Sequence, residues 1–471
     1  MIKIHSNFPK LIDEFLLILK LFYSEEDLDN FDMDFFVEQE IIDDYKIKTI
    51  VSLSNFDITI NRTDEIIDKN FPERYLKRFG KIALYDLLKN NFFKNKILPW
   101  GSLTGIRPTK LYYELIKENN DDSIKAFNIL INDFKVDFYK ALMVREIINN
   151  QKFIIKNDNI VDLYVNIPFC PSKCYYCSFI SQPIDKCSHL LDAYLDALIK
   201  EINDSKKLIL QKNYIVRSVY IGGGTPTVLT AEQLDKLLSV LNFNVNEFTV
   251  ECGRPDTITK EKLDILKKHN VSRISINPQT FSDKTFKLIG RSHSSSNIFN
   301  AYKMAIEYNF IVNMDLIAGL GNEKFNTFKN SLEKTLECAP DNITIHTLSF
   351  KNSSNLKING GEVSETDEVR KMINYSVEKL KEFGYKPYYL YKQKNMLGNL
   401  ENIGYFKENP CVFNITSMEE FASIIACGAN GISKRYYSVN NRIERFANVK
   451  NISDYISRID EMISKKYNLF K

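Results

Sequence analysis

The chain has 471 residues, which is too long for one ordinary core and predicts two or three folding units. Hydrophobic residues make up 44% and charged residues 26%, a balance typical of globular proteins and not of disordered or fibrous chains. Because 63 basic side chains face 60 acidic ones, for a net charge of +3, we expect neither nucleic acid nor an anionic membrane surface as a partner.

The amino-terminal segment 1–5 lacks the basic flank, apolar core and cleavage site of a secretory signal, so we expect a cytoplasmic protein. The apolar stretch 15–23 contains Lys20 and is shorter than the roughly 20 residues of a membrane span, which predicts a buried helix. The eight cysteines form one bunch of three and five scattered residues, unlike the framework of a small disulfide-rich domain. Reduced thiols, and therefore metal or redox chemistry, are expected.

Residues 1–155 are predicted to form an α+β accessory domain. Segment 45–60 alternates like half-buried strands, whereas 64–90 and 122–149 carry apolar residues at helical spacing. The loop 98–110 is rich in Gly and Pro and contains the single Trp. We interpret this loop as a domain connection in preference to a flap or docking loop near the substrate.

From residue 156 to 355, short β-rich runs alternate with helical stretches, a pattern typical of βαβ units and a parallel sheet. The six candidate strands are 163–167, 218–222, 247–252, 273–277, 311–317 and 343–348. Six units predict an α/β fold, a partial (β/α)6 barrel that is open on one side and carries functional groups at the C-terminal strand ends. Residues 356–471 are predicted to form a C-terminal α+β element that covers the substrate.

The first candidate strand ends in a short loop that carries Cys170, Cys174 and Cys177. Three thiolates at this spacing can hold one face of a small cluster, and they leave one metal position open. A structural zinc site is the alternative, and it normally has four ligands. Cys187 and His189 are the nearest candidates to complete such a site, but an iron-sulfur cluster is the favoured interpretation.

Glycines or polar residues also follow the later candidate strands. The run Gly222-Gly223-Gly224-Thr225 either forms a tight turn or allows a ligand to approach the backbone. The polar residues at or after the third, fourth and fifth strands are Glu251, Gln279, Arg291 and Asp315. Singly, Glu251 or Asp315 could be a satisfied structural carboxylate, whereas their recurrence at successive strand ends predicts one shared polar pocket.

Taken together, these motifs resemble the radical S-adenosylmethionine (SAM) enzymes, and among them the oxygen-independent coproporphyrinogen III oxidase group. The matching segments are Tyr164-x-x-Ile167-Pro168-Phe169-Cys170-x-x-x-Cys174-x-x-Cys177, Gly222-Gly223-Gly224-Thr225-Pro226, Gln279 with Arg291, and Asp315-Leu316-Ile317-x-Gly319-Leu320. Two further segments look like the HemZ-type coproporphyrinogen dehydrogenase branch, namely Glu251-x-Gly253-Arg254-Pro255-Asp256-Thr257 and 391–402. The resemblance covers the chain from about residue 160 onward, and the extra N-terminal domain is similar too.

The resemblance implies a 4Fe-4S cluster held by Cys170, Cys174 and Cys177. The SAM-binding residues that it implies are Tyr164, Tyr176, Gly222, Gly223, Gly224, Thr225, Glu251, Gln279, Arg291 and Asp315. It also implies an oxidoreductase of haem biosynthesis, in which an electron cleaves SAM and the 5′-deoxyadenosyl radical takes hydrogen from a propionate. Loss of carbon dioxide and an electron then leaves a vinyl group, and two such steps convert coproporphyrinogen III to protoporphyrinogen IX.

The implied partners are a tetrapyrrole substrate and a low-potential electron donor such as flavodoxin or ferredoxin. Lys392 and Lys394 are suspected of holding the propionates. Asn166 and Ser178 depart from the family pattern, so two alternatives stay open: a haem chaperone, or a radical SAM methylase or ring-opening enzyme acting on haem. The segment 427–434 resembles the family's glycine-rich return to the active site; a turn in a small sheet is the alternative.

Overall fold

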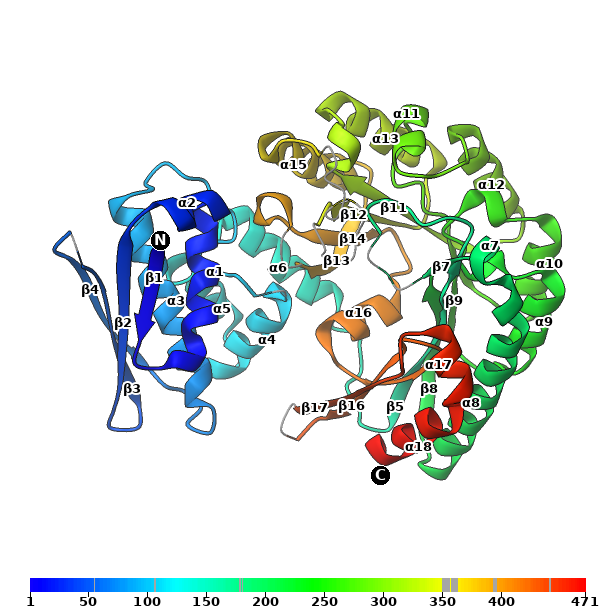
Figure 1. Ribbon diagram of the computed structural model, residues 1–471, viewed down its shortest axis with the longest axis horizontal. Helices are drawn as coiled ribbons and strands as arrows, with labels where there is room; N and C mark the ends of the chain where they lie inside the picture. Colours follow the sequence, from blue (N-terminus) through cyan, green and yellow to red (C-terminus); the bar gives the residue numbers. More distant parts are fainter. Residues whose placement is uncertain are drawn as a thin grey trace. The chain divides into compact units, whose positions relative to one another are not determined.

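The structure is a computed structural model that describes residues 1–54, 56–105, 107–177, 179, 181–349, 356, 363–392, 396–439 and 442–471. The chain divides into two compact units, Met1–Ile148 and Asn149–Lys471, each of which is considered by itself (Figure 1). The division into three parts at residues 155 and 355 stays a prediction. None of the helices in these ranges is long and apolar enough to cross a membrane.

The first unit contains a four-stranded sheet with the order β1-β2-β3-β4, in which β1 and β2 are parallel and the other neighbours are antiparallel. Its strands are β1 (Ile2–Ser6), β2 (Met33–Ile42), β3 (Lys46–Leu53) and β4 (Ile58–Glu65). The helices are α1 (Ile12–Phe22), α2 (Glu25–Asn30), α3 (Pro72–Asn91), α4 (Pro108–Glu118), α5 (Ser123–Asn132) and α6 (Phe138–Asn150). Helices α1 and α3 pack their apolar faces on this sheet, as the helical spacing of their apolar residues predicts.

The loop 98–110 lies inside the first unit, between α3 and α4. Trp100 is completely buried, and the backbone N–H of Ser102 donates to the carbonyl of Phe134 at 2.8 Å. The interpretation of this loop as a connection between domains is therefore wrong, because the helices on both sides of it belong to one unit. Ile106 lies outside the described residues.

The second unit is built on one eleven-stranded sheet with the order β13-β14-β12-β11-β10-β9-β8-β5-β15-β16-β17. Six parallel strands form its centre: β5 (Ile160–Ile167), β8 (Ile215–Gly223), β9 (Glu247–Glu251), β10 (Arg273–Ser275), β11 (Ile311–Ala318) and β12 (Asn342–Thr347). All six coincide with the candidate strands, so the predicted partial (β/α)6 barrel is confirmed. Strands β5 and β11 are buried along most of their length, which explains their nearly continuous apolar sequences.

Helices connect these parallel strands and cover the outer face of the sheet (Figure 1). They are α7 (Ile184–Cys187), α8 (Leu191–Gln211), α9 (Ala231–Ser239), α10 (Lys260–Lys268), α11 (Asp283–Leu288), α12 (Ser295–Glu307) and α13 (Phe325–Cys338). Side chains fix where some of them begin: Thr230 and Gln233 form a capping box at α9, and Ser294 and Asn297 form one at α12. Two short strands, β6 (Phe169–Cys170) and β7 (Gln182–Pro183), enclose the cysteine loop.

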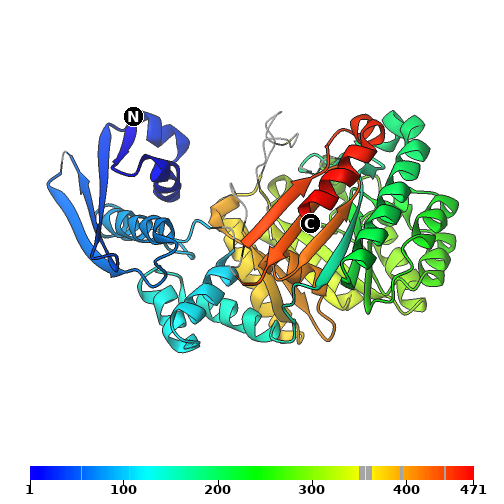
Figure 2. The same cartoon turned by 90° about the horizontal axis from the view of Figure 1, so that it is seen from below.

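The C-terminal part of the chain extends the same sheet at both edges. Its elements are α15 (Thr366–Glu382), β13 (Lys386–Tyr391), β14 (Asn402–Phe406), α16 (Val412–Glu419), β15 (Ser423–Cys427), β16 (Ile432–Tyr437), β17 (Arg442–Ala447), α17 (Ile452–Ser457) and α18 (Ile459–Leu469). Strand β14 pairs antiparallel with β12, and β15 pairs parallel with β5. Figure 2 shows the last helices, in red, beside α8 and the hairpin β16–β17. The predicted C-terminal α+β element is thus continuous with the barrel.

Candidate functional site

The central strands of the second unit direct polar side chains into one cavity of about 370 Å³, a volume suited to a cofactor-sized ligand. Alternate residues of a strand point to the same face of the sheet, so the cavity wall follows a two-residue spacing. The wall residues on or directly after these strands are Tyr164, Tyr220, Glu251, Ser275, Asn277, Asn313, Asp315, Ile317, Thr344 and His346. The site therefore lies at the C-terminal ends of the parallel strands, where barrel enzymes place their chemistry.

Apart from Gly222, the residues predicted from the sequence to form the site line this cavity. They are Tyr164, Cys170, Cys174, Tyr176, Cys177, Gly223, Gly224, Thr225, Glu251, Gln279, Arg291 and Asp315. Their individual roles stay predictions, but the cavity brings together groups that are up to about 150 positions apart in the sequence.

Gly222 and Gly223 are needed because side chains of the protein approach them closely. A Cβ atom on Gly222 would lie 2.8 Å from Cδ of Glu251, and one on Gly223 would lie 2.0 Å from Oδ1 of Asn166. Gly223 also has a φ of +107°, which side-chain-bearing residues rarely adopt. The positions that a Cβ would take on these two glycines are thus filled by Glu251 and Asn166, while Gly223 still lines the cavity.

Replacing Gly223 with Ala should destabilise the second unit by more than backbone strain alone, because the new methyl group would displace Asn166. Gly384→Ala is the matched control: Gly384 has a φ of +80°, and a Cβ there meets nothing within 4 Å. The control substitution should lower the free energy of unfolding by about 1–2 kcal/mol, because the backbone at this position is left-handed. Thermal unfolding of both apo variants checks this expectation, and equal midpoints would contradict it.

The three clustered cysteines are free thiols in the loop after β5. The hydroxyl of Thr225 donates to Sγ of Cys170 at 3.5 Å. Burial, together with the neighbouring thiols of Cys174 and Cys170, raises the pKa of Cys177 to about 11. Burial also acts to raise the pKa of Cys174, but the positive charges of Arg291 and Arg254, together with hydrogen bonds from Arg291 and Tyr176, outweigh it and lower that pKa. Cys174 is thus the thiol that its surroundings best prepare to be a thiolate ligand.

This donor set fits an iron-sulfur cluster and not a zinc ion. Within the described ranges, no three Cys, His, Asp or Glu side chains converge where a single metal ion could bind. The ligands of a cluster do not need to converge in this way, because each thiolate binds a different iron atom. Cys187, a candidate fourth zinc ligand, instead donates from Sγ to the carbonyl of Pro183 at 3.1 Å, and neither it nor His189 lines the cavity.

Glu251 supplies a carboxylate to the wall of the cavity. Its Oε1 accepts a hydrogen bond from the Tyr220 hydroxyl at 2.6 Å, and its Oε2 accepts one from the Gly223 N–H at 3.3 Å. Burial raises the pKa of Glu251 to about 7, and the negative charge of Asp315 contributes. No basic side chain is among the contacts that the described residues make with this carboxylate. It is therefore suited to bind a cationic group of a ligand.

Several buried polar atoms of the wall have no hydrogen-bond partner within the described part of the protein. They are Ser275 Oγ, Asn277 Oδ1, Gln279 Oε1 and Arg291 Nε. Gln279 also has a φ of +68°, a strained value for a residue with a side chain, and its N–H donates to the Asp315 carbonyl at 2.8 Å. Because buried polar atoms are normally paired, these four mark a place for a polar ligand.

Sequence reasoning missed His346 and Tyr389 as residues of the cavity wall. Nε2 of His346 lies 3.7 Å from Oδ2 of Asp315, and Nδ1 lies 3.4 Å from the Tyr391 hydroxyl. The rings of Tyr389 and Tyr391 are stacked with centroids 6.2 Å apart. A signal was present, because Thr344 and His346 interrupt an apolar strand at two-residue spacing.

The lysines suspected of holding the propionates are not found at the cavity. Lys392 is buried and does not line it, and Lys394 lies outside the described residues, as does Ser178. The basic side chains in the described wall are Arg254, Arg291 and His346. Any anionic substrate group must therefore be met by one of these three or by residues that the structure does not describe.

Asn166 links the first strand to the glycine turn of the segment 427–434. Its Oδ1 accepts from the Tyr164 hydroxyl at 3.0 Å, and its Nδ2 donates to the Ala429 carbonyl at 2.7 Å. A Cβ on Gly428 would lie 2.5 Å from the Asn166 carbonyl oxygen. None of the segment 427–434 lines the cavity. The segment contacts the end of β5 through Asn166 instead.

Comparison with known proteins agrees with this geometry. Residues 164–335 match the radical SAM superfamily. The oxygen-independent coproporphyrinogen-III oxidase-like protein HemZ of Bacillus subtilis is 38% identical over 381 residues, which cover 78% of this chain and 76% of that protein. The heme chaperone HemW of the same organism is 34% identical over 192 residues, which cover 39% of this chain and 49% of that protein. The solved coproporphyrinogen III oxidase HemN of Escherichia coli has a similar fold, with a TM-score of 0.52 and 23% identity, over 69% of this chain and 73% of that one.

Proposed function

Because this chain belongs to the radical SAM superfamily, in the family of oxygen-independent coproporphyrinogen-III oxidase-like proteins, we propose that it oxidatively decarboxylates propionate groups of a tetrapyrrole. Proteins of this superfamily use a 4Fe-4S cluster and SAM. The observation that carries the proposal is the composition of a single cavity. Among the described residues, three free thiols, a carboxylate that no basic side chain contacts and four buried polar atoms without a hydrogen-bond partner belong to residues of this cavity's wall.

In this proposal Cys170, Cys174 and Cys177 hold the cluster, and the ionised carboxylate of Glu251 binds the cationic amino group of SAM. The cluster and SAM together supply an electron and the means to remove a hydrogen atom from an unactivated carbon. Gln279 and Arg291 offer their unpaired atoms to the polar part of the cofactor. The protein's own task is to orient the reacting carbon and to exclude water.

The substrate assignment is supported by the relatives and by the aromatic residues of the cavity wall. Tyr220, Tyr389 and Tyr391 present aromatic surface to the cavity, as a ligand made of pyrrole rings requires. An electron donor of low potential, such as flavodoxin or ferredoxin, is part of the proposal because the cluster must be reduced before SAM is cleaved.

An anaerobic assay tests the proposed reaction. The reconstituted protein is incubated with SAM, a low-potential reductant and either coproporphyrinogen III or haem, and the products are identified by mass spectrometry. We expect 5′-deoxyadenosine together with loss of carbon dioxide from coproporphyrinogen III. Formation of 5′-deoxyadenosine without any change in the porphyrinogen would refute the substrate assignment, whereas a modified haem would point to a methylase or ring-opening enzyme.

A second candidate function is haem binding and transfer, which the 34% identity to the heme chaperone HemW favours. It requires stoichiometric binding of haem, transfer to an acceptor protein and no porphyrinogen turnover. The same assay separates the two candidates, because a chaperone leaves coproporphyrinogen III unchanged.

Replacing His346 with Leu, which cannot donate a hydrogen bond, should raise the KM for coproporphyrinogen III roughly tenfold or more, since a hydrogen bond to a charged group contributes about 1.5–3 kcal/mol. Arg254 and Arg291 are already engaged near the cysteines, so His346 is the basic group of the described wall best placed to meet a substrate carboxylate. The affinity for SAM should stay unchanged. His346→Arg keeps a hydrogen-bond donor at this position and should recover most of the substrate affinity. An unchanged KM in His346→Leu would remove this residue from the substrate site.

A further inference from the structure

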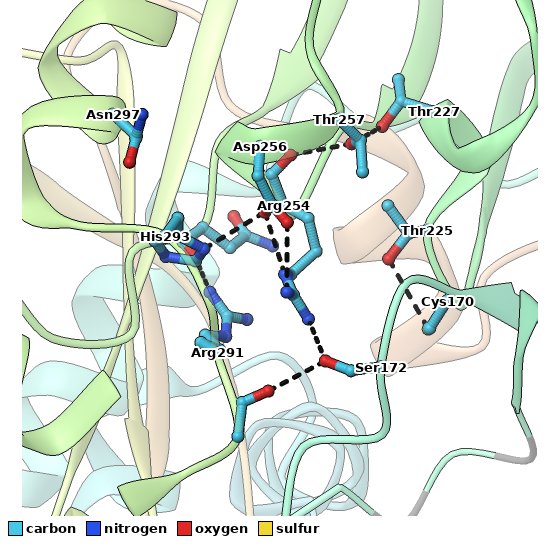
Figure 3. Close-up of polar contacts among 12 residues, drawn as sticks. Cys170, Ser172, Thr225, Thr227, Arg254, Asp256, Thr257, Arg291, His293 and Asn297 are labelled. Atoms are coloured by element: carbon cyan, nitrogen blue, oxygen red, sulfur yellow. Dashed lines mark hydrogen bonds and ion pairs between the residues drawn. The ribbon is translucent and has the colours of Figure 1, made fainter. Parts of the chain in front are cut away.

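The motif after β9 contains a charged pair whose role the proposed function does not explain. Arg254 is 3% exposed and lies in the cavity wall. Its Nε and Nη2 donate to the two carboxylate oxygens of Asp256 at 3.2 and 3.3 Å, and its Nη1 donates to the Ser172 hydroxyl at 3.0 Å. Figure 3 shows the guanidinium group between Asp256 and Ser172. A buried arginine with three engaged donors is a positive charge fixed in position.

Ser172 lies in the interval between Cys170 and Cys174, so this arginine acts on the loop that carries the thiols. The Ser172 hydroxyl accepts from Arg254 and donates to the carbonyl of Gly290 at 2.8 Å. The cysteine loop is thus bonded both to the end of β9 and to the segment that precedes α12. Loss of the arginine would remove one of these two attachments.

Asp256 is itself held by a second partner. Nδ1 of His293 lies 3.2 Å from Oδ1 of Asp256, and the imidazole side chain is completely buried. Burial lowers the pKa of His293, so the ring is neutral at pH 7 and donates the Nδ1 proton to the carboxylate. Burial acts to raise the pKa of Asp256, but the bond from His293 and the charge of Arg254 outweigh it and hold that pKa far below its usual range. Asp256 is therefore ionised at neutral pH.

We propose that the pair Arg254 and Asp256 positions the cysteine loop and adjusts the reduction potential of the cluster. Arg254 shifts this potential in the positive direction, and Asp256 shifts it in the negative direction. The proposal rests on the proposed role of the three cysteines as cluster ligands. Reduction adds one negative charge to a cluster, so a nearby positive charge favours the reduced state and a nearby negative charge opposes it. Burial keeps the effect of Arg254 strong, because little water screens its charge, whereas the side chain of Asp256 is 26% exposed and its effect should be the smaller of the two. Arg254 and Asp256 are positioning residues, because they act on the cluster through the cysteine loop and through the electric field of their charges.

The test compares Arg254→Gln and Asp256→Asn in the reconstituted holoprotein. The midpoint potential of the cluster is measured by redox titration followed by electron paramagnetic resonance, and iron and sulfide are counted per chain. We expect Arg254→Gln to shift the potential in the negative direction and Asp256→Asn to shift it in the positive direction. A merely structural role would not give shifts of opposite sign, so shifts of the same sign, or none in either variant, would overturn the proposal.

Two further variants protect the test against misfolding. Arg254→Lys keeps the charge but loses the planar fork, so its potential should stay near that of the unmodified protein while its cluster is lost faster. Arg217→Gln is the matched control, because Arg217 makes the same two-bond pair with Asp162, at 3.1 and 2.6 Å, near the start of β8. This pair lies roughly 20 Å along the strand from the glycines, at about 3.3 Å per residue, and its loss should leave the potential unchanged.

If Arg254→Gln retains no cluster, Asp256→Asn decides alone: a positive shift supports the proposal, and a zero or negative shift overturns it. Failure of the underlying site assignment has a different signature. In that case the triple variant Cys170→Ala, Cys174→Ala, Cys177→Ala would take up as much iron as the unmodified protein, whatever the two charge variants do.

Discussion

Cys174→Ser should reduce 5′-deoxyadenosine formation by at least 100-fold and lower the iron bound per chain, the largest loss of activity that we expect from a single substitution. Cys174 lies at the centre of the loop, and the guanidinium of Arg291 lowers the pKa of its thiol against the effect of burial. A serine hydroxyl does not ionise near neutral pH, so it is a much weaker ligand for iron. Iron and sulfide analysis, together with the absorption spectrum of the reconstituted protein, measures the loss independently of turnover.

Cys187→Ser is the matched control for this substitution. Cys187 is also buried and free, but its Sγ donates to the Pro183 carbonyl, a bond that a serine hydroxyl can replace. The control should therefore retain its iron and its activity. Loss of metal in Cys187→Ser would instead support the zinc site that the sequence left as an alternative.

Glu251→Gln should weaken SAM binding while it stabilises the apo protein above pH 7, and the two effects have one cause. The folded pKa of Glu251 is raised from 4.5 to about 7, so the folded state of the native protein loses stability as the pH rises between these values. At 1.36 kcal/mol per pKa unit, the loss is on the order of 3 kcal/mol at pH 8. Gln cannot ionise and avoids this loss, so the variant should unfold at higher denaturant concentration at pH 8 and show little difference at pH 4.

The same substitution removes the negative charge that the proposed function uses to bind SAM. Isothermal titration with the reconstituted protein should show affinity weaker by roughly 10- to 100-fold, as expected for loss of a hydrogen bond between charged groups. In the native protein the affinity should fall about tenfold per pH unit below pH 7, because binding must then displace a proton from Glu251. Glu261→Gln, an exposed position in the first turn of α10, should show neither effect. Unchanged SAM affinity in Glu251→Gln would leave the carboxylate without its proposed ligand.

The parallel strands could be predicted because each combines an apolar run with a polar end, as Asp315 shows within β11. The arrangement of the C-terminal strands could not be predicted in this way. Nothing in the local sequence of β15 specifies that it pairs with β5, which lies about 260 residues earlier. Such pairings depend on which edge of the sheet stays open, and local propensity carries no information about that.

The candidate site was predictable where one residue type carries the chemistry and not where two distant side chains share it. The spacing of Cys170, Cys174 and Cys177 favoured a cluster over a zinc site, and all three line the cavity. The contact between Asp256 and His293 joins positions 37 residues apart, and the need for glycine at 222 becomes clear only when Glu251 is seen beside it. Strand alternation would have identified His346, had it been applied to the polar residues of β12 as well as to its apolar ones.

The pairing of β15 with β5 has a consequence for how the protein is made. Strand β5 leaves the ribosome early, but its partner at that edge is synthesised only after residue 423, once the other five central strands have emerged. Until then the backbone groups of β5 along this edge have no strand to bond, and a nascent or truncated chain presents an open edge that other chains can bind. The second unit therefore completes its fold only when β15, near the end of the chain, pairs with β5, the first strand of the unit. Chains that stop before β15 should aggregate.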